Sequence, residues 1–384
     1  MRKTVLIALG LSMTLAACGK ERTLKQAYKD DFRIGCALRS AEKTGAPHYV
    51  FPVAKEPQEL EVMAREFNVV TPENLMKPQY MRPAPGEFNF EQADEFIDLA
   101  EQYGLEVVGH VLVWHAQTPE WFFQDENGDT ISREALIERL REHIYTIVGR
   151  YKGRIKYWDV VNEAVDTREV NGVAQEAFFR KSKWLEIIGP EFIELAFQFA
   201  HEADPKAELV YNDYAMTHKA KVDFVAENIV KRLKGKEIPI HGVGMQAHWH
   251  LQYPKSSELA VAIETLAEAG VHVSITELDI GVLPLADGYK GADVNKRIEL
   301  QDKLNPYKEG APADVLERQA RKYRQVFDVL LEHRRNIERV TFWGISDRDS
   351  WKNNHPVRGR SDYPLLFDRQ FQPKPAYREL IELP

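Results

Sequence analysis

Eight strand-like runs alternate with amphipathic helical stretches along this 384-residue chain, and this alternation predicts a (β/α)8 barrel, an α/β fold, in a single domain. No low-complexity linker or change in composition divides residues 30–384. The length also fits, because a barrel of this type needs roughly 250 residues and accommodates insertions. An open doubly wound sheet accounts less well for eight successive strand and helix units.

The strands are predicted from short runs rich in Val, Ile and other residues that suit a buried parallel sheet. In order, they cover residues 33–37, 68–71, 106–112, 156–161, 208–212, 242–246, 272–276 and 339–343. Helical periodicity places helices between them, at residues 91–103, 132–150, 184–203, 222–234, 257–269 and 314–332. Ser132 is expected to be an N-cap, and Gly104 and Gly270 stand where helix C-caps are expected. Residues 281–312 are predicted to form a long loop after the seventh strand.

The N-terminus has the pattern of an export signal. Two cations are followed by an apolar run, residues 5–15, that is too short to span a bilayer. Leu15-Ala16-Ala17-Cys18 comes next and resembles the bacterial lipoprotein box, in which the cysteine is lipidated and becomes the first mature residue. This predicts a signal peptide at residues 1–17, a lipid on Cys18 and a tether at residues 18–29. An ordinary secretory signal cleaved near Ala17 is the alternative.

These features predict an exported lipoprotein anchored to a membrane, with the outer membrane of a Gram-negative cell as the expected location. The formal net charge of −8 argues against nucleic acid or an anionic membrane surface as the main partner, and it suits a neutral substrate. With Cys18 lipidated, Cys36 is the only cysteine left, so no disulfide can form within the chain. Cys36 is expected to be a buried, inert thiol.

Polar and aromatic side chains follow seven of the predicted strands, at the face where the carboxyl ends of barrel strands meet. Strand by strand they are Glu73, Asn74 and Lys77; His110, Trp114 and His115; Asn162 and Glu163; Asn212, Asp213 and Tyr214; Gln246, His248, Trp249 and His250; Glu277 and Asp279; and Trp343 with Trp351 beyond it. Such groups hydrogen-bond hydroxyls and stack on sugar rings. Two carboxylates held by one rigid sheet are also the minimum equipment for cleaving a glycosidic bond.

Several of these stretches also match the motifs of a known family. They are Thr71-Pro72-Glu73-Asn74-Leu75-Met76-Lys77, Trp158-Asp159-Val160-Val161-Asn162-Glu163-Ala164, Ile275-Thr276-Glu277-Leu278-Asp279, and shorter strings within residues 110–119, 246–248, 342–351 and 364–368. On these motifs the chain resembles glycoside hydrolase family 10, the endo-β-1,4-xylanases, over about residues 32–380. Pro78, where family members often have Trp, and the loop at residues 281–312 depart from the pattern. Both departures bear on how far the cleft extends and which branches on xylan are tolerated.

The resemblance implies a retaining endo-1,4-β-xylanase that acts on xylan and xylo-oligosaccharides as a monomer, without a metal or other cofactor. By motif, Glu163 corresponds to the general acid/base and Glu277 to the nucleophile, which predicts a separation of roughly 5–5.5 Å between the two carboxyl groups. Asp279 is expected behind His248, where it would orient the imidazole, and Asp159 and Trp158 are expected to be structural. The residues implied to bind substrate are Glu73, Asn74, Lys77, His110, Trp114, Asn162, Gln246, His248, Trp343 and Trp351.

Three other interpretations stay open at this point. A related barrel cellulase or mannanase would share the chemistry and differ in substrate. A non-catalytic glycan-binding surface lipoprotein would need neither glutamate. A metal-dependent hydrolase would use His110, His115, His248 and His250, but barrel metallohydrolases usually carry two ligands on the first strand, and residues 33–37 contain none.

Overall fold

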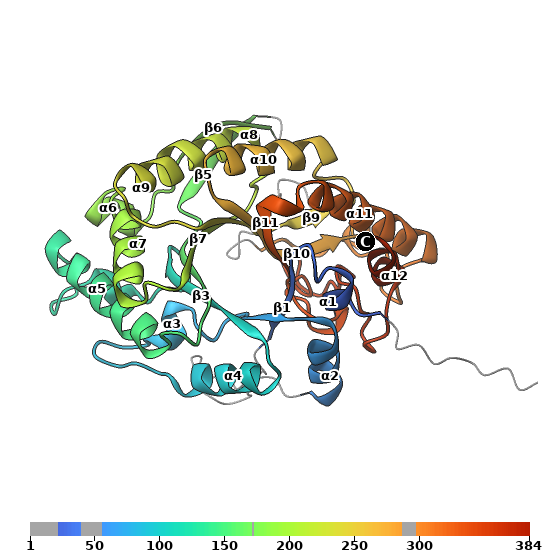
Figure 1. Ribbon diagram of the computed structural model, residues 1–384, viewed down its shortest axis with the longest axis horizontal. Helices are drawn as coiled ribbons and strands as arrows, with labels where there is room; N and C mark the ends of the chain where they lie inside the picture. Colours follow the sequence, from blue (N-terminus) through green and yellow to red (C-terminus); the bar gives the residue numbers. More distant parts are fainter. Residues whose placement is uncertain (1–21, 40–55, 171–172, 286–296) are drawn as a thin grey trace, which may run out of the picture.

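The computed structural model describes residues 22–39, 56–170, 173–285 and 297–384, and it contains eight parallel strands closed into a barrel (Figure 1). The strands are β1 (Arg33–Leu38), β2 (Val69–Pro72), β3 (Glu106–Trp114), β4 (Tyr157–Asn162), β7 (Glu208–Asp213), β8 (Gly242–Met245), β10 (His272–Gly281) and β11 (Ile337–Phe342). Since β11 pairs with both β1 and β10, the sheet closes on itself. The predicted (β/α)8 fold is confirmed.

Helices surround the barrel, as Figure 1 shows in a view that looks into the ring of strands. The longer ones are α2 (Pro57–Glu66), α4 (Glu91–Gln102), α5 (Arg133–Arg150), α7 (Phe192–Ala203), α10 (Ser256–Glu268), α11 (Ala313–Glu332) and α12 (Pro375–Glu382). Shorter ones are α1 (Leu24–Ala27), α3 (Pro78–Met81), α6 (Lys183–Ile188), α8 (Lys219–Val225) and α9 (Lys231–Gly235). Single 3-10 turns lie at Glu120–Phe123, Asp302–Leu304, Arg334–Asn336 and Asp347–Asp349.

Local sequence signals explain where several helices begin and end. The Ser132 hydroxyl accepts a hydrogen bond from the Ala135 backbone N–H at 3.3 Å, so the predicted N-cap of α5 is confirmed. Gly104 and Gly270 have φ angles of 68° and 84° just after α4 and α10, a conformation that ends a helix at little cost for glycine. The inner face of α5 buries Leu, Ile and Val side chains against the barrel, so burial and capping together fix this helix.

The helix predicted at residues 184–203 is wrong as a single element, because the structure divides it into α6 and α7. Gly189 ends α6 with a φ of 95°, and Pro190 lacks the N–H that a continuing helix would need. The helix predicted at residues 222–234 begins earlier, at Lys219, and contains a π-helical turn at Ala226–Val230 between α8 and α9. The bounds of α2 and α12 were not predicted from the sequence.

An antiparallel hairpin of β5 (Val165–Val170) and β6 (Val173–Phe179) follows β4 and was also not predicted. It packs on α8, where the Phe179 ring meets the Phe224 ring edge-on at 5.1 Å. The short strand β9 (His248–His250) pairs with the end of β10, which sets His248 beside Asp279. β10 runs to Gly281, so the predicted loop at residues 281–312 starts at the end of a strand; residues 286–296 of it lie outside the described ranges.

The tether predicted for residues 18–29 is wrong at its C-terminal end. Leu24 and Tyr28 are fully buried, and the Tyr28 hydroxyl donates to the Leu380 carbonyl oxygen of α12 at 2.7 Å. The Leu24 N–H donates to the Glu66 carboxylate at 2.9 Å, so α1 is packed against the barrel domain. The apolar residues of this segment are spaced three and four positions apart, as on one face of a helix. That spacing predicts a helix, whereas the polar composition of the segment does not reveal it. Residues 1–17 and Cys18 lie outside the described part of the chain.

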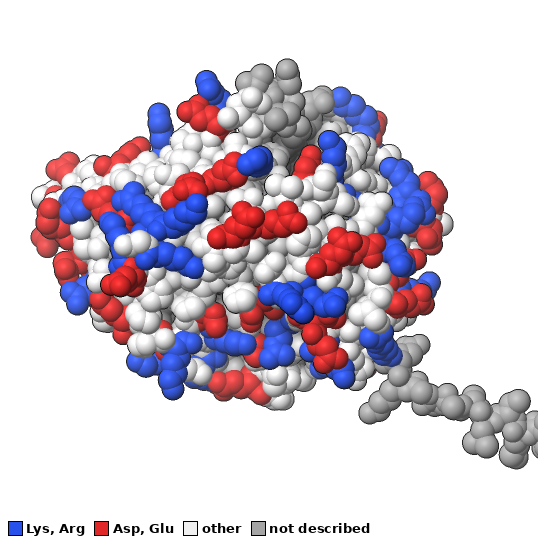
Figure 2. Space-filling view, turned by 45° about the horizontal axis from the view of Figure 1, so that its top comes forward, with Lys and Arg blue, Asp and Glu red and all other residues white. Residues whose placement is uncertain are grey.

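Within the described residues, no helix combines the length and the hydropathy required to cross a membrane. Figure 2 shows acidic and basic side chains interspersed over the visible face, without a large area of one sign. Cys36 is fully buried in β1, as predicted. Arg339 is buried inside the barrel, where its guanidinium lies 3.6 Å from the Asp159 carboxylate and 5.3 Å from the centre of the Tyr157 ring.

Candidate active site

A cavity of about 120 Å³ opens at the carboxyl ends of the barrel strands. It is lined by Glu73, Asn74, Lys77, His110, Trp114, Gln117, Asn162, Glu163, Gln246, His248, Glu277, Trp343 and Trp351. Every residue that the sequence suggested for catalysis or substrate binding therefore lines one cavity, and Gln117 joins them. Asp279 lies directly behind it, fully buried. The common location follows from the barrel, which brings the ends of all its strands to one face.

Glu163 is the first residue after β4 and has a φ of 58°, an uncommon backbone conformation for a residue with a side chain. Two contacts hold this turn: its N–H donates to the Asn212 carbonyl at 2.8 Å, and its carbonyl accepts from Arg180 at 2.8 Å. The carboxylate accepts a hydrogen bond from the Gln246 amide at 2.9 Å. His115 Nδ1 lies 3.8 Å from its other oxygen. The side chain is thus buried and aimed into the cavity.

Glu277 projects from β10 into the same cavity, and each of its oxygens has a different partner. One accepts a 2.8 Å hydrogen bond from the Asn212 amide, and the other lies 3.1 Å from His248 Nε2. Burial on its own would raise the pKa of Glu277, but the hydrogen bond and charge of His248, with help from His110 and Asn212, hold it below the usual value. This carboxylate is therefore kept ionised.

The His248 ring is fixed from both sides, because its Nδ1 lies 3.0 Å from the Asp279 carboxylate. Burial opposes protonation of the ring, but Asp279 and Glu277 outweigh it and raise the pKa of His248 to about 9. The sequence prediction that Asp279 lies behind His248 agrees with this distance. The Nε2–H of His250, two residues on, donates to the Leu283 carbonyl at 2.8 Å instead.

On the β2 side of the cavity, Lys77 is buried beside Trp114. Its ammonium lies 5.0 Å from the centre of the indole and donates to the Asn74 side chain at 3.0 Å. Burial lowers the pKa of Lys77 and raises the pKa of Glu73, and each group partly offsets the shift of the other. Together these side chains offer an ammonium, a carboxyl and an amide to a bound hydroxylated ring.

Aromatic rings form the floor of the cavity, and a ring behind them packs against a glycine. Trp343 meets His110 edge-on at 5.5 Å, and His110 Nδ1 bonds the Asp159 carboxylate at 2.9 Å. Behind them, a Cβ on Gly109 would lie 2.2 Å from the Trp158 ring, so Trp158 packs against bare backbone. Asp159 and Trp158 thus support the site from behind it, as the sequence predicted.

Asn162 and Asn212 link the two glutamates. The Asn162 amide lies within 3.2 Å of the Trp114 indole nitrogen and 3.0 Å from the Asn212 amide nitrogen. Asn212 is fully buried, and its carboxamide oxygen accepts a 2.7 Å hydrogen bond from the Thr276 hydroxyl. Its place at the end of the fifth strand was visible in the sequence, but its contact with Glu277 was not predicted. Gln117 lies within one of the matched strings, although no role was assigned to it, and Lys352, which also contributes to the region, gave no signal beyond its residue type.

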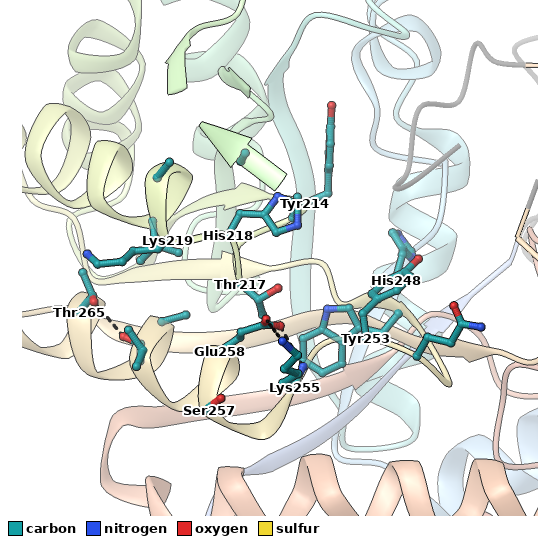
Figure 3. Close-up of a pocket in the computed structure, with 18 residues that line it drawn as sticks. Tyr214, Thr217, His218, Lys219, His248, Tyr253, Lys255, Ser257, Glu258 and Thr265 are labelled. Carbon is teal, nitrogen blue, oxygen red and sulfur yellow. Dashed lines mark hydrogen bonds and ion pairs between the residues drawn. The ribbon is translucent and has the colours of Figure 1, made fainter. Parts of the chain in front are cut away.

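A second cavity, of about 620 Å³, adjoins the first, and His248 lines both (Figure 3). It lies between α8 and α10, and its lining includes Tyr214, Trp249, Tyr253, Val222 and Val261. In the strand order, β2 and β8 face each other across the barrel. The larger cavity, formed by elements that follow β7, β8 and β9, is therefore on the opposite side of the glutamate pair from Lys77.

The described residues contain no group of three or more His, Cys, Asp or Glu side chains arranged to hold a metal ion. The two rings of the His-x-His pair bond to different partners, Glu277 and the Leu283 carbonyl. The arrangement therefore offers acid–base and nucleophilic carboxylate chemistry from Glu163 and Glu277.

Comparison with known proteins gives one consistent result. A family model described as "Glycosyl hydrolase family 10" matches residues 23–383. "Endo-1,4-beta-xylanase A" of Xylanibacter ruminicola is 39% identical over 386 residues, which covers 100% of both chains. Among solved structures, one described as a novel GH10 endoxylanase from a sugarcane soil metagenome has 45% identity and a TM-score of 0.86, covering 94% of this chain and 100% of that one. A mutant protein solved in complex with xylotriose has 38% identity and a TM-score of 0.78, covering 94% and 99%.

Proposed function

Because the chain belongs to glycosyl hydrolase family 10, we propose that it is an endo-1,4-β-xylanase that cleaves xylan and xylo-oligosaccharides with retention of configuration. The observation that carries the proposal is the unequal environment of two buried glutamates that line one cavity. Glu277 is held ionised by an imidazole and an amide, whereas Glu163 faces the cavity and has the Gln246 and Asn162 amides 2.9 and 3.3 Å from one of its oxygens. A retaining glycosidase needs this division between a nucleophile and an acid.

In the first step, the Glu277 carboxylate attacks the anomeric carbon while Glu163 gives its proton to the glycosidic oxygen. The bond from the anomeric carbon to that oxygen breaks, the leaving chain departs as an alcohol, and the sugar is bound to Glu277 as an ester. The sugar alkoxide is a poor leaving group, so the proton is needed as the bond breaks.

In the second step, the charge on Glu277 is absent because the residue is esterified, and Glu163 is now ionised. Glu163 takes a proton from water as the oxygen of that water attacks the anomeric carbon and displaces Glu277. Two inversions give net retention, and both carboxyl groups return to their starting states. Asn162 is placed beside the pair, where it can bond the hydroxyl next to the anomeric carbon and strengthen that contact in the transition state.

We also propose a direction for the bound chain. Glu73, Asn74 and Lys77 take the sugar on the non-reducing side of the cleaved bond, because that is the role the family motif implies. The larger cavity of Figure 3 lies across the barrel from them, so it receives the leaving side of the chain. Xylose lacks the hydroxymethyl group of glucose, and we propose that Trp114, Trp343 and Lys77, which line the cavity, exclude that group.

The N-terminal motif supports a further proposal, that the enzyme is exported and anchored to a membrane, in a Gram-negative cell the outer membrane, through a lipid on Cys18. Palmitate labelling of cells that express the full chain tests it. Incorporation that is lost in Cys18→Ala supports the anchor, and equal labelling of both chains or of neither contradicts it.

The function is tested with xylohexaose and by following the anomeric proton of the newly formed product by NMR. We expect the β-anomer to appear first. Glu277→Ala is expected to be nearly inactive, with azide restoring part of the activity and giving an α-glycosyl azide. Initial release of the α-anomer would contradict retention. Faster hydrolysis of cello- or manno-oligosaccharides would make the protein a related barrel glycanase, and binding of xylohexaose without turnover would make it a non-catalytic binder.

A further inference from the structure

Asp279, the carboxylate behind His248, has two more partners besides the imidazole. The Trp351 indole N–H donates to one of its oxygens at 2.7 Å, the same oxygen that lies 3.0 Å from His248 Nδ1. The Lys352 ammonium lies 2.5 Å from the other oxygen. Asp279 is fully buried, and such a charge is tolerated when it is paired and hydrogen-bonded. Lys352 is therefore its cationic partner at the oxygen that does not face His248.

Lys352 itself is held in place. It follows the 3-10 turn Asp347–Asp349 that comes after β11, its side chain is 14% exposed, and its ammonium also donates to the Trp249 carbonyl at 3.3 Å. A Cβ on Gly281 would lie 3.5 Å from this ammonium and 2.9 Å from the Asp362 carboxylate. The glycine at the end of β10 thus leaves room for the Asp362 carboxylate, while a Cβ there would meet the ammonium only at an ordinary contact distance.

Four side chains consequently form a line of alternating charge: Glu277, His248, Asp279 and Lys352. With the ring protonated, the formal charges in this line cancel. Burial would raise the pKa of Asp279, but Lys352, followed by His248, keeps it below the usual value. Loss of the lysine would leave Asp279 with only His248 as a cationic neighbour in this line, so the imidazolium would be drawn more strongly toward Asp279 and away from Glu277.

We propose that Lys352 is a positioning residue for the reaction: it fixes Asp279, Asp279 fixes the His248 ring, and the ring holds the Glu277 carboxylate in line for attack. This deepens the proposed function and rests on Glu277 being the nucleophile. Neither the sequence motifs nor the composition of the cavity pointed to Lys352, because it does not line the cavity.

Other charged and titratable groups face this line from several elements. They are Lys77 and His110 near Glu277, His250 of β9, Tyr253, Tyr323 of α11, and His355, Arg360 and Asp362 of the C-terminal segment. Lys352 differs from all of them in its direct ion pair with Asp279. Burial and the nearby Lys352 and Arg360 lower the pKa of His250, which separates its titration from that of His248.

The test compares Lys352→Met, which removes the charge, with Lys352→Arg, which keeps it. For Lys352→Met we expect the acid limb of the kcat/KM profile on xylohexaose to move up by about half to one pH unit. This is the size of effect expected when one positive charge is removed a few ångström beyond His248 and Asp279 in the line that starts at Glu277. On that limb this equals a loss of about three- to tenfold in rate. Lys352→Arg is expected to keep the limb of the parent. Lys352→Gln makes the same comparison if the methionine variant does not fold.

Lys322→Met is the matched control, because Lys322 is also buried but donates to the Pro254 carbonyl rather than to Asp279. It is expected to leave the acid limb unchanged. NMR titration of the His248 ring gives a readout that does not depend on turnover, and we expect its pKa to rise in Lys352→Met and not in Lys352→Arg. The proposal would be overturned if Lys352→Met kept both the acid limb of kcat/KM and the His248 ring pKa of the parent. It would also be overturned if Lys322→Met shifted them equally. A parent that leaves xylohexaose intact would overturn the proposed function, while the ring titration would still test the ion pair.

Discussion

Asn212→Ala removes the amide that donates to the Glu277 carboxylate. The hydrogen bond is 2.8 Å long and fully buried, and hydrogen bonds to charged groups contribute about 1.5–3 kcal/mol. Since this bond favours the ionised form of Glu277, its loss raises the pKa of the carboxyl, and 1.36 kcal/mol corresponds to about one pH unit. We therefore expect the acid limb of kcat/KM to move up by about one to two pH units.

The assay is the pH profile of xylohexaose hydrolysis, with circular dichroism to show that each variant is folded. The same free energy predicts a loss of about 10- to 100-fold in kcat/KM on the acid limb. Thr276→Val is the matched control, because it removes the hydroxyl that bonds the Asn212 oxygen at 2.7 Å and leaves the amide next to Glu277. Its shift should be smaller. An unchanged acid limb in Asn212→Ala, or an equal shift in both variants, would refute the account of how Glu277 is kept ionised.

Three other predictions concern the same site. Glu163→Gln should abolish hydrolysis of xylohexaose but spare the first step on aryl xylosides with good leaving groups; an equal loss on both would show that Glu163 is not the acid. The pKa of His248 is raised from 6.5 to about 9, so its protonation should stabilise the fold below pH 6.5 by at most about 3 kcal/mol and be lost as pH rises through 9. Chemical denaturation at pH 6.5 and 9.5 should therefore show that the free energy of unfolding falls more in the parent than in His248→Asn. Equal falls in both proteins would contradict this prediction. Exhaustive chelation should leave activity unchanged, and inactivation that zinc reverses would favour a metal-dependent hydrolase instead.

Much of the fold could be predicted from the sequence because its signals are local. Buried parallel strands need runs of Val and Ile, and helices need apolar residues at 3.6-residue spacing, so strand and helix alternation was visible along the chain. The break at Gly189 and Pro190 was also encoded locally, although the surrounding periodicity masked it. The hairpin that begins at Val165 was not expected, since it depends on packing against α8, far along the chain. The burial of Leu24 and Tyr28 likewise depends on α12 at the other end of the chain.

For the site, the sequence by itself determined the chemistry: two glutamates after strands and a set of amides, imidazoles and indoles in family motifs. Only the tertiary structure decided which of these groups contact one another. Asn212 and Lys352 are ordinary residues in the sequence, and they matter because barrel closure sets one 2.8 Å from Glu277 and the other 2.5 Å from Asp279. The physical reason is the separation along the chain over which each kind of interaction acts. Helix and strand patterns reflect neighbours within a few positions, whereas the protonation of a buried carboxyl depends on charges that come within a few ångström only after folding.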